Sequence, residues 1–327
     1  MMRKDALLSV EDLKTYFYTN LGIVKAVDGV SFSVKSGEAL GLAGESGCGK
    51  SVTCLSIIRL VSKPAGRVVG GKVLFEGEDL LTKDEKEMRH WRGKKISMIL
   101  QDPLMSLNPV YTIGDQVAEA FALDRVRRVT IRRRVIDVLS SVKIPSAAER
   151  LDCYPFQFSG GMRQRTAAAI AIARSPKLLI ADEPTTSLDV TIQAQFLKLL
   201  KEIQQQNNMA LILVSHDLSI VAEICDRVAI MYAGRIVESG TVKRVYEHPG
   251  HPYTQALMQA IPILGHKKKR LFQIEGEPPN LARLPAGCHF HPRCRKAMDI
   301  CRVEYPPMFN MGEDSYAACW LLKKGKA

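Results

Sequence analysis

One segment of eight residues, 44–51, constrains the fold of this chain more than any other. It reads Gly-Glu-Ser-Gly-Cys-Gly-Lys-Ser and fits the pattern G-x4-G-K-[ST]. An apolar run over 39–43 precedes it, and a helix is predicted from about Lys50 to Leu60. Glycines let backbone N–H groups converge on phosphate oxygens, and the N-terminus of the following helix adds a favourable dipole. The segment therefore predicts a nucleotide-binding loop between a strand and a helix of an α/β fold.

The residue types in this phosphate loop have distinct chemical tasks. Lys50 is predicted to neutralise the β- and γ-phosphates, and the Ser51 hydroxyl is predicted to bind Mg²⁺. Cys48 is interpreted as a small neutral residue that alkylating reagents can reach. The predicted nucleotide contacts of this segment are Gly44, Glu45, Ser46, Gly47, Cys48, Gly49, Lys50, Ser51 and Val52.

Two adjacent acids, Asp182 and Glu183, end another apolar run, over 178–181. If that run is a parallel strand, Asp182 lies at the carboxyl edge of the sheet beside the phosphate loop, where a carboxylate for Mg²⁺ belongs. Glu183 is then placed to polarise an attacking water as a general base. The alternative, two acids that cap a helix, explains their position after an apolar strand less well.

Two more polar residues follow predicted strands. Gln101 ends the run 96–100, where an amide can reach the metal and the nucleophilic water. His216 follows the run 210–215, where an imidazole can contact the γ-phosphate. By itself neither is specific, because a lone histidine at a strand end is more often structural than catalytic.

A second glycine-containing segment, Ser159, Gly160 and Gly161, precedes a helix predicted from Met162. Bare N–H groups at a helix N-terminus bind phosphate. The phosphate loop already holds the nucleotide of this chain, so we expect this segment to bind a nucleotide that another subunit holds. Two chains would then enclose two ATP molecules.

Apolar periodicity supports an α/β core with a mostly parallel sheet and a helical insertion. The pattern is helical over about 103–158, and after residue 240 the periodicity weakens and prolines multiply. Strands are predicted at 7–18, 26–34, 39–43, 73–75, 96–100, 178–181, 210–215 and 227–232, and helices at 50–60, 162–173 and 191–207.

The formal net charge of +12 comes largely from basic runs at 125–134 and 267–270. Such runs are typical of a solvated helix surface and a linker, and attraction to an anionic membrane or to nucleic acid is the alternative. No apolar run approaches the roughly 20 residues of a membrane span, and the first ten residues do not predict a signal peptide. We therefore expect a cytosolic chain unless a partner holds it at a membrane.

Four of the eight cysteines lie in the last forty residues, at Cys288, Cys294, Cys301 and Cys319. In a reducing cytosol, four thiols on a proline-rich segment favour a metal or cluster that orders the segment. An iron–sulfur cluster and a zinc ion are both chemically suitable, and His289 or His291 can replace a thiolate for zinc. The spacing matches neither common zinc ribbons nor ferredoxins, so free or structural thiols are a third interpretation.

In order and spacing, these motifs resemble the full set of the ATP-binding-cassette (ABC) ATPases. Phe158 and Met162 depart from the commonest signature, which has Leu and Gln there, and this departure is similar to the peptide-importer branch. Segments 101–109 and 247–254 also resemble dipeptide and oligopeptide importer ATPases, and the resemblance runs from Leu7 to Trp320. The Walker A, Q-loop, signature, Walker B, D-loop and switch-histidine motifs correspond to 44–51, Gln101, 159–164, 178–184, 187–189 and His216.

The resemblance implies an ABC-type core with an antiparallel β subdomain, an α-helical subdomain and a small Cys-rich C-terminal extension. We predict an ATPase domain over 1–240, with its helical subdomain over about 103–160, and the extension over 241–327.

The resemblance also implies ATP and Mg²⁺ as cofactors. It implies that Glu183, His216 and Gln101 are catalytic, and that Ser51, Gln101 and Asp182 bind Mg²⁺. An aromatic residue of the first strand stacks on adenine in this family; Phe17 is the best match and Tyr16 the second. In some members of the peptide-importer branch, four cysteines matching those of this tail hold a [4Fe–4S] cluster, and zinc is the alternative.

The function implied is that of an ATP-hydrolysing subunit that powers import of dipeptides or oligopeptides. Its expected partners are a homologous ATPase, two membrane-spanning permeases and, indirectly, an extracytoplasmic peptide-binding protein. Its expected location is peripheral, at the cytoplasmic face of the cell membrane. Import of nickel is an alternative. A soluble cassette protein acting on nucleic acid fits less well, because this chain has one cassette and no sustained heptads. A cassette that binds ATP without hydrolysis is disfavoured because the motif residues are all present.

Overall fold

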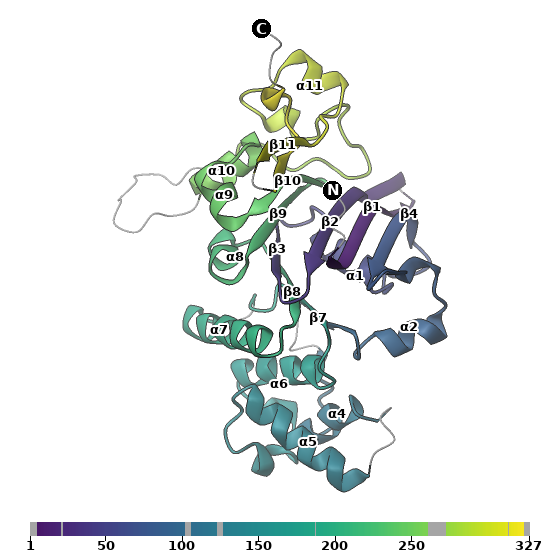
Figure 1. Ribbon diagram of the computed structural model, residues 1–327, viewed down its shortest axis with the longest axis vertical. Helices are drawn as coiled ribbons and strands as arrows, with labels where there is room; N and C mark the ends of the chain where they lie inside the picture. Colours follow the sequence, from purple (N-terminus) through teal and green to yellow (C-terminus); the bar gives the residue numbers. More distant parts are fainter. Residues whose placement is uncertain are drawn as a thin grey trace. The chain divides into compact units, whose positions relative to one another are not determined.

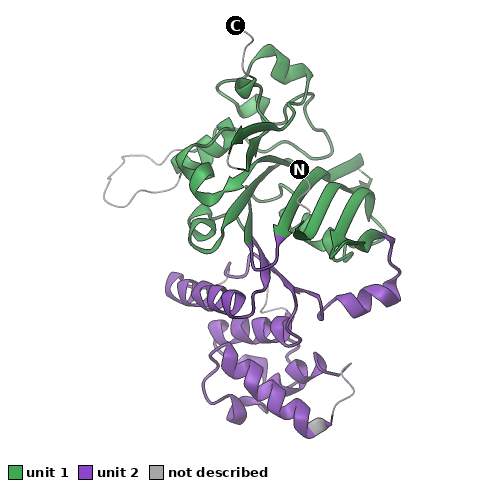
Figure 2. Cartoon of the chain, viewed as in Figure 1, with its two compact units in different colours: residues 1–34, 39–81, 215–327 green, residues 35–38, 82–214 purple. Residues whose placement is uncertain are grey.

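The computed structural model describes residues 5–20, 22–101, 106–122, 127–186, 188–260, 273–312 and 314–323. The chain divides into two compact units (Figure 2). Unit 1 comprises Met1–Val34, Ala39–Leu81 and Ser215–Ala327, and unit 2 comprises Lys35–Glu38 and Thr82–Val214. These two units do not test the predicted domain boundary at residue 240, which stays a prediction.

An antiparallel sheet of unit 1 begins the chain. Its strand order is β2-β1-β4-β5, with β1 Ala6–Thr19, β2 Gly22–Lys35, β4 Gly66–Phe75 and β5 Glu78–Asp79 (Figure 1). Leu8, Val10 and Leu13 of β1 are buried, and Leu8 is opposite Phe75 in the antiparallel ladder with β4. Only residues 73–75 of β4 are predicted from sequence, because Gly70 and Gly71 interrupt the apolar alternation that identifies a strand.

Further strands of unit 1 connect the phosphate loop, which follows β3, with strands of the C-terminal segment, the predicted extension over 241–327. β3 Ala39–Ala43 is parallel to β9 Arg227–Tyr232, β9 is antiparallel to β10 Arg235–Thr241, and β12 Ser315–Ala317 pairs with both β10 and β11 Phe309–Gly312. Every residue of β3 is buried. The C-terminal segment is therefore joined by strand pairing to β3, the strand before the phosphate loop, through β10 and β9. The helices of unit 1 are α1 Lys50–Ile57, α8 Leu218–Ile224, α9 Val242–Glu247, α10 Pro252–Ala260 and α11 Asp299–Val303.

Unit 2 has three parallel strands in the order β8-β7-β6. These are β6 Ile96–Ile99, β7 Leu178–Asp182 and β8 Ala210–Ser215. All residues of β7 and β8 are buried, which is typical of parallel strands covered on both faces. The helices of unit 2 are α2 Glu85–Trp91, α4 Ile113–Glu119, α5 Arg128–Ser141, α6 Gly160–Ile172 and α7 Val190–Gln206. Short 3₁₀ turns complete the chain: η1 Leu80–Thr82, η2 Ala147–Arg150, η3 Pro155–Gln157, η4 His291–Arg293 and η5 Trp320–Leu322.

The predicted mixture of α/β core, antiparallel sheet and helical insertion is confirmed, with shifts at element ends. The helix expected from Met162 begins at Gly160, and α1 ends at Ile57 rather than Leu60 because Arg59 has a left-handed φ of 55°. The basic run 267–270 and residues 125 and 126 of the other basic run lie outside the described residues. Within the part of the chain that is described, no helix is long and apolar enough to cross a membrane.

Candidate nucleotide-hydrolysis site

The phosphate loop is pressed against the backbone of two strands. A Cβ on Gly49 would lie 2.1 Å from the carbonyl oxygen of Ala26 in β2, and one on Gly44 would lie 2.3 Å from that of Met231 in β9. Gly49 also has a φ of 106°, which L residues rarely adopt. These two glycines are therefore required by close approach and by backbone conformation, as well as by the predicted approach of phosphate.

Lys50 begins α1 and is 4% exposed. Its Nζ donates hydrogen bonds to the carbonyl oxygens of Gly44 at 2.8 Å and Glu45 at 2.9 Å. Backbone N–H groups in the first turn of a helix have no acceptor within the helix and are typical donors to anions, and Ser51 lies in this turn of α1. The loop thus places a cation beside the first turn of a helix.

Cys48 differs from the expectation. It is 5% exposed rather than accessible, and burial raises the pKa of its thiol. A buried thiol with a raised pKa is a poor nucleophile. The expectation that alkylating reagents reach Cys48 is therefore wrong, and the interpretation of this residue as a small neutral side chain is the one the structure supports.

Glu45 is held by residues that the sequence analysis missed. The guanidinium of Arg293 in η4 binds the Glu45 carboxylate through both ends, Nη1 to Oε2 at 2.7 Å and Nη2 to Oε1 at 3.0 Å. The Glu45 N–H donates to the hydroxyl of Tyr253 in α10 at 3.0 Å. Tyr253 lies in segment 247–254, which resembles the peptide importers, and Arg293 lies in the sequence His-Pro-Arg-Cys. Neither segment indicates a contact with Glu45.

Phe17 and Tyr16, the two candidates for adenine stacking, have different surroundings in β1. The Tyr16 hydroxyl donates to Asp28 Oδ1 at 2.6 Å, and burial together with Asp28 raises the pKa of Tyr16 to about 12. Phe17 is half-buried. Side chains two apart on a strand share a face, and Thr15 contacts Ser56 of α1. Phe17 is therefore on the side of β1 that carries α1, the helix that follows the phosphate loop.

In unit 2, Gln101 and Glu183 come together at the carboxyl ends of neighbouring strands. The Gln101 Nε2 lies 3.4 Å from Glu183 Oε2, and Asp182, the last residue of β7, is 3% exposed. Glu183 has a φ of 42° and its N–H donates to the carbonyl of Val214 in β8. Backbone strain in a non-glycine residue is often found at functional sites.

A further contact of Glu183 is absent from the sequence predictions. The Thr186 hydroxyl donates to the Glu183 carbonyl at 3.1 Å and lies 3.3 Å from its Oε2. A turn three residues after Glu183 leaves no periodic signal in sequence.

The segment 159–161 caps α6. Ser159 Oγ accepts a hydrogen bond from the Met162 N–H at 3.3 Å, and a Cβ on Gly161 would lie 2.7 Å from Cγ2 of Ile192 in α7. Gln164 Nε2 donates to the carbonyl of Pro184, the residue after Glu183. The signature helix is therefore tied to the chain that follows the two acids. Ser187 lies outside the described residues.

His216 directly follows β8, belongs to unit 1 and has an exposed side chain. The next residue, Asp217, caps α8 by accepting a hydrogen bond from the Ser219 N–H at 2.8 Å. Unit 1 therefore carries the phosphate loop, Phe17 and His216, and unit 2 carries Gln101, Asp182, Glu183 and the signature segment.

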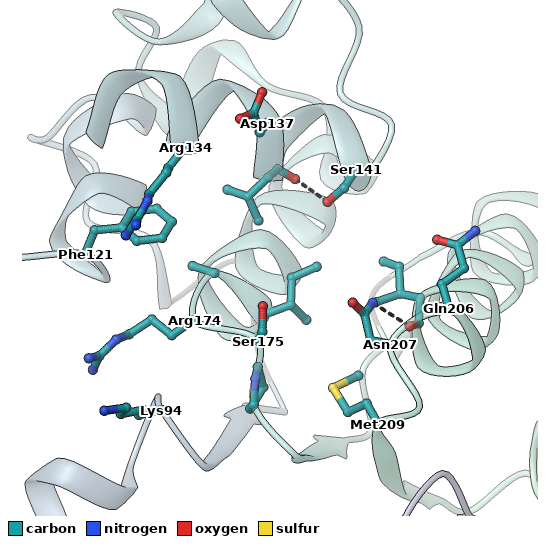
Figure 3. A pocket seen from close by; sticks show the side chains of 15 residues that line it. Lys94, Phe121, Arg134, Asp137, Ser141, Arg174, Ser175, Gln206, Asn207 and Met209 are labelled. Carbon is teal, nitrogen blue, oxygen red and sulfur yellow. Dashed lines mark hydrogen bonds between the residues drawn. The ribbon is translucent and has the colours of Figure 1, made fainter. Parts of the chain in front are cut away.

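A cavity of about 650 Å³ in unit 2 is distinct from these residues (Figure 3). Lys94, Pro176 and Met209, which line it, precede β6, β7 and β8, so the cavity is at the amino ends of the strands. Gln101 and Asp182 lie at the carboxyl ends. This cavity is therefore not the nucleotide site.

The four tail cysteines line one small cavity in unit 1, together with residues that include Phe290 and Trp320. Burial, with a smaller contribution from the charges of the other tail cysteines, raises the pKa of Cys288 and of Cys319 to about 11. His289 contacts the carbonyl of Ala233 through Nδ1 at 3.3 Å. Among the described residues, no group of three or more His, Cys, Asp or Glu side chains is arranged to hold a single metal ion.

Two family models match the chain. The model described as "ABC transporter" matches residues 27–186, and the model described as "Oligopeptide/dipeptide transporter, C-terminal region" matches residues 237–301. The dipeptide transport ATP-binding protein DppD of Escherichia coli is 48% identical over 96% of this chain and 96% of its own length. The oligopeptide transport ATP-binding protein OppD of Bacillus subtilis is 46% identical over 98% of this chain and 90% of its own length.

Solved structures show the same fold. A dimeric ATP-binding cassette in a post-hydrolysis state with ADP and Pi superposes with a TM-score of 0.64 at 23% identity, covering 72% of this chain and 98% of that one. The cbiO1 subunit of Clostridium perfringens, part of an ABC transporter complex, superposes with a TM-score of 0.65 at 28% identity, covering 75% of this chain and 92% of that one.

Proposed function

This chain belongs to the ATP-binding subunits of ABC importers for dipeptides and oligopeptides, and on that premise we propose how its residues divide the work of ATP hydrolysis. It is an ATPase subunit that powers peptide import. The main prediction from the sequence is therefore favoured over its alternatives, nickel import and action on nucleic acid. We assign Lys50 to the β- and γ-phosphates, and Ser51, Gln101 and Asp182 to Mg²⁺. Glu183 is the general base, and Phe17 stacks on adenine.

The observation that carries this assignment is the convergence of Gln101 on Glu183. An amide 3.4 Å from a carboxylate can hold a water between the metal and the base, and its strand ends beside the strand that Asp182 ends. Because the signature segment of a chain serves the nucleotide of its partner, we propose that His216 and the partner's signature complete the γ-phosphate site. Hydrolysis of each nucleotide then needs two cassettes.

The direct test is ATP-dependent peptide uptake by the assembled transporter in vesicles. The parent chain is expected to support uptake, and Lys50→Ala is expected to abolish it together with ATP binding. Uptake that persists with Lys50→Ala, or uptake of Ni²⁺ without uptake of any di- or oligopeptide, contradicts the proposal.

The subunit pairs with another ATPase and with transmembrane permeases, and we propose where the permease docks. A cavity of about 330 Å³ lies between the end of β6 and helices α4 and α6, lined by residues that include Leu100, Ser106 and Glu119. Leu100 is 48% exposed although it is apolar. An exposed apolar side chain beside a hollow fits a short permease helix. Docking there would hold the chain at the cytoplasmic face of the membrane and couple the permease to Gln101.

For the tail, we propose that Cys288, Cys294, Cys301 and Cys319 hold a [4Fe–4S] cluster. The four thiols line a single cavity, and four cysteine thiolates are the ligand set that such a cluster would take. Because the pKa values of Cys288 and Cys319 are raised, a cationic metal centre would be needed to stabilise their thiolates. A cluster held by the four cysteines would cross-link the tail and order it.

Anaerobic purification with iron, sulfide and zinc analysis tests the cluster. About four irons and sulfides per chain, lost in Cys294→Ser or Cys301→Ser and retained in Cys153→Ser, are expected. One zinc without iron would identify the alternative, and a metal-free protein would contradict both.

A further inference from the structure

We propose that Arg293 is a positioning residue for the nucleotide: it neutralises Glu45 and holds that carboxylate away from the phosphates. The inference rests on the proposed ATP site and adds a residue of the C-terminal segment to it.

Glu45 is a chemical anomaly in the phosphate loop. It is the only acid among residues 44–51, and it follows the first glycine of a segment that binds a polyanion. A carboxylate near a triphosphate repels it, and this repulsion is stronger in a partly buried site than in water. Some other group must therefore offset the charge of Glu45 if the loop is to bind ATP tightly.

Arg293 is built for that task. Its side chain is 5% exposed and makes a two-pronged ion pair with Glu45, the geometry that a guanidinium offers and an ammonium does not. Its Nε donates to the carbonyl of Glu275 at 3.1 Å, and Nη1 lies 3.4 Å from the Tyr232 hydroxyl. Burial alone would lower the pKa of Arg293, but the bonds to Glu45 and Tyr232 outweigh it, and the pKa is raised.

The backbone of Glu45 is held from the same part of the chain. Its N–H donates to the Tyr253 hydroxyl, and Tyr253 is completely buried, with its ring 4.6 Å from that of Tyr232 and 5.3 Å from that of Phe290, three residues before Arg293. The position of Glu45 is thus set by residues that come more than 200 positions later in sequence. The C-terminal segment therefore has a role in nucleotide affinity besides any role in assembly.

A double-mutant cycle on the purified full-length chain tests the inference, with Mg²⁺-ATP binding measured by calorimetry. Arg293→Gln is expected to weaken ATP binding about tenfold, because it leaves an unpaired carboxylate in the loop. Glu45→Gln alone is expected to change affinity less than about threefold, and the double variant is expected to recover to within about threefold of the parent. Arg295→Gln is the matched control, since it removes the same charge from an exposed pair with Glu275.

Two readouts separate charge neutralisation from a merely structural role. The loss in Arg293→Gln is expected to be largest for ATP, smaller for ADP and absent for adenosine, because it scales with phosphate charge. Arg293→Lys, which keeps the charge without the fork, is expected to lose less than about threefold.

A double variant as weak as Arg293→Gln, or equal losses for ATP and adenosine, would overturn the inference. If Arg293→Gln does not fold, a Lys variant that folds yet loses tenfold overturns it as well. A parent chain that binds no ATP would instead refute the proposed function, so the two failures are distinguishable.

Discussion

The phosphate loop of unit 1 and Glu183, the proposed general base in unit 2, differ in the contacts that hold them. Gly44 and Gly49 rest against strand backbones, Lys50 makes two hydrogen bonds shorter than 3 Å, and Glu45 is held through both its side chain and its N–H. Glu183, in contrast, is half-buried and has a strained φ, and its contacts to the side chains of Gln101 and Thr186 are 3.4 and 3.3 Å long.

This difference separates binding from hydrolysis. Fixed donors that need no rearrangement give affinity, whereas long, poorly aligned contacts around a base are the ones that tighten only when the reactive complex forms. We therefore infer that one chain contains a finished ATP-binding loop, and that its hydrolytic residues reach working geometry in the assembled transporter.

The largest expected effect is on the side of hydrolysis. Glu183→Gln removes the proposed general base but keeps the shape of the residue, so turnover by the assembled transporter is expected to fall at least about a hundredfold. ATP affinity is expected to stay within about twofold, because the phosphate loop is unchanged. Phosphate release and nucleotide binding measured on the same preparation check this. Unchanged hydrolysis in Glu183→Gln would remove Glu183 as the base.

The next effect tests how firmly the phosphate loop is built. Gly49→Ala places a methyl group on the Ala26 carbonyl and forces a φ of 106° on alanine, so the free energy of unfolding is expected to fall by about 3 kcal/mol or more. Gly47→Ala is the control: Gly47 also has a positive φ, of 76°, but no atom lies within 4 Å of the place its methyl group would take, so a loss of about 1 kcal/mol is expected. Equal losses in urea unfolding would show that conformation, not contact with β2, dictates the glycine.

Asp28 lies in β2, the strand that supports Gly49, and it is expected to make the stability of the fold depend on pH. Its carboxylate accepts from Tyr16 at 2.6 Å and pairs with Arg235 at 2.7 Å. Burial alone would raise the pKa of Asp28, but these hydrogen bonds outweigh it and the pKa is lowered. The stabilisation is therefore fully present above the unfolded pKa of about 3.9 and is lost as pH falls through the folded pKa.

Asp28→Asn is accordingly expected to cost about 2 kcal/mol of unfolding free energy at pH 7, with a smaller difference from the parent below about pH 4. Asp12→Asn is the control, because Asp12 makes an exposed pair with Lys14 and its loss is expected to cost less than about 1 kcal/mol. A difference at Asp28 that does not shrink in acid would contradict this account of the pair.

The smallest expected effect comes from comparing Ser159, which caps a helix and belongs to the signature segment, with Asp84, which only caps a helix. Ser159 caps α6, and Asp84 caps α2 with a full capping box, so alanine at either position is expected to cost about 1 kcal/mol of stability. Only Ser159→Ala is expected to lower ATP turnover as well, since α2 carries no motif residue. A similar drop in turnover for Asp84→Ala would mean that helix stability alone explains the effect at Ser159.

Sequence predicted the motif-bearing strands well because apolar runs and glycines are local signals. It placed 39–43 and 210–215 correctly as strands and the phosphate loop between strand and helix. It missed α2, although Asp84 and Glu87 form a recognisable capping box, and it missed β10, whose Glu238 is polar yet completely buried.

The contacts that sequence could not supply are long-range. Arg293 and Glu45 are 248 positions apart, and no periodicity or spacing connects them. Thr186 is a local exception: it lies three positions after Glu183, yet no sequence pattern marks it, whereas Gln101 is identified by its position at a strand end. Local chemistry was predictable, and the side chains that support it depend on tertiary packing.

Mg²⁺-ATP binding and turnover, each measured on the isolated chain and on the assembled transporter, show whether one chain binds ATP fully but hydrolyses it only after assembly. Mg²⁺-ATP affinity of the isolated chain is expected to lie within about threefold of its value in the transporter. Turnover per site is expected to rise at least about a hundredfold on assembly. An isolated monomer that hydrolyses ATP at the transporter's rate would contradict the claim.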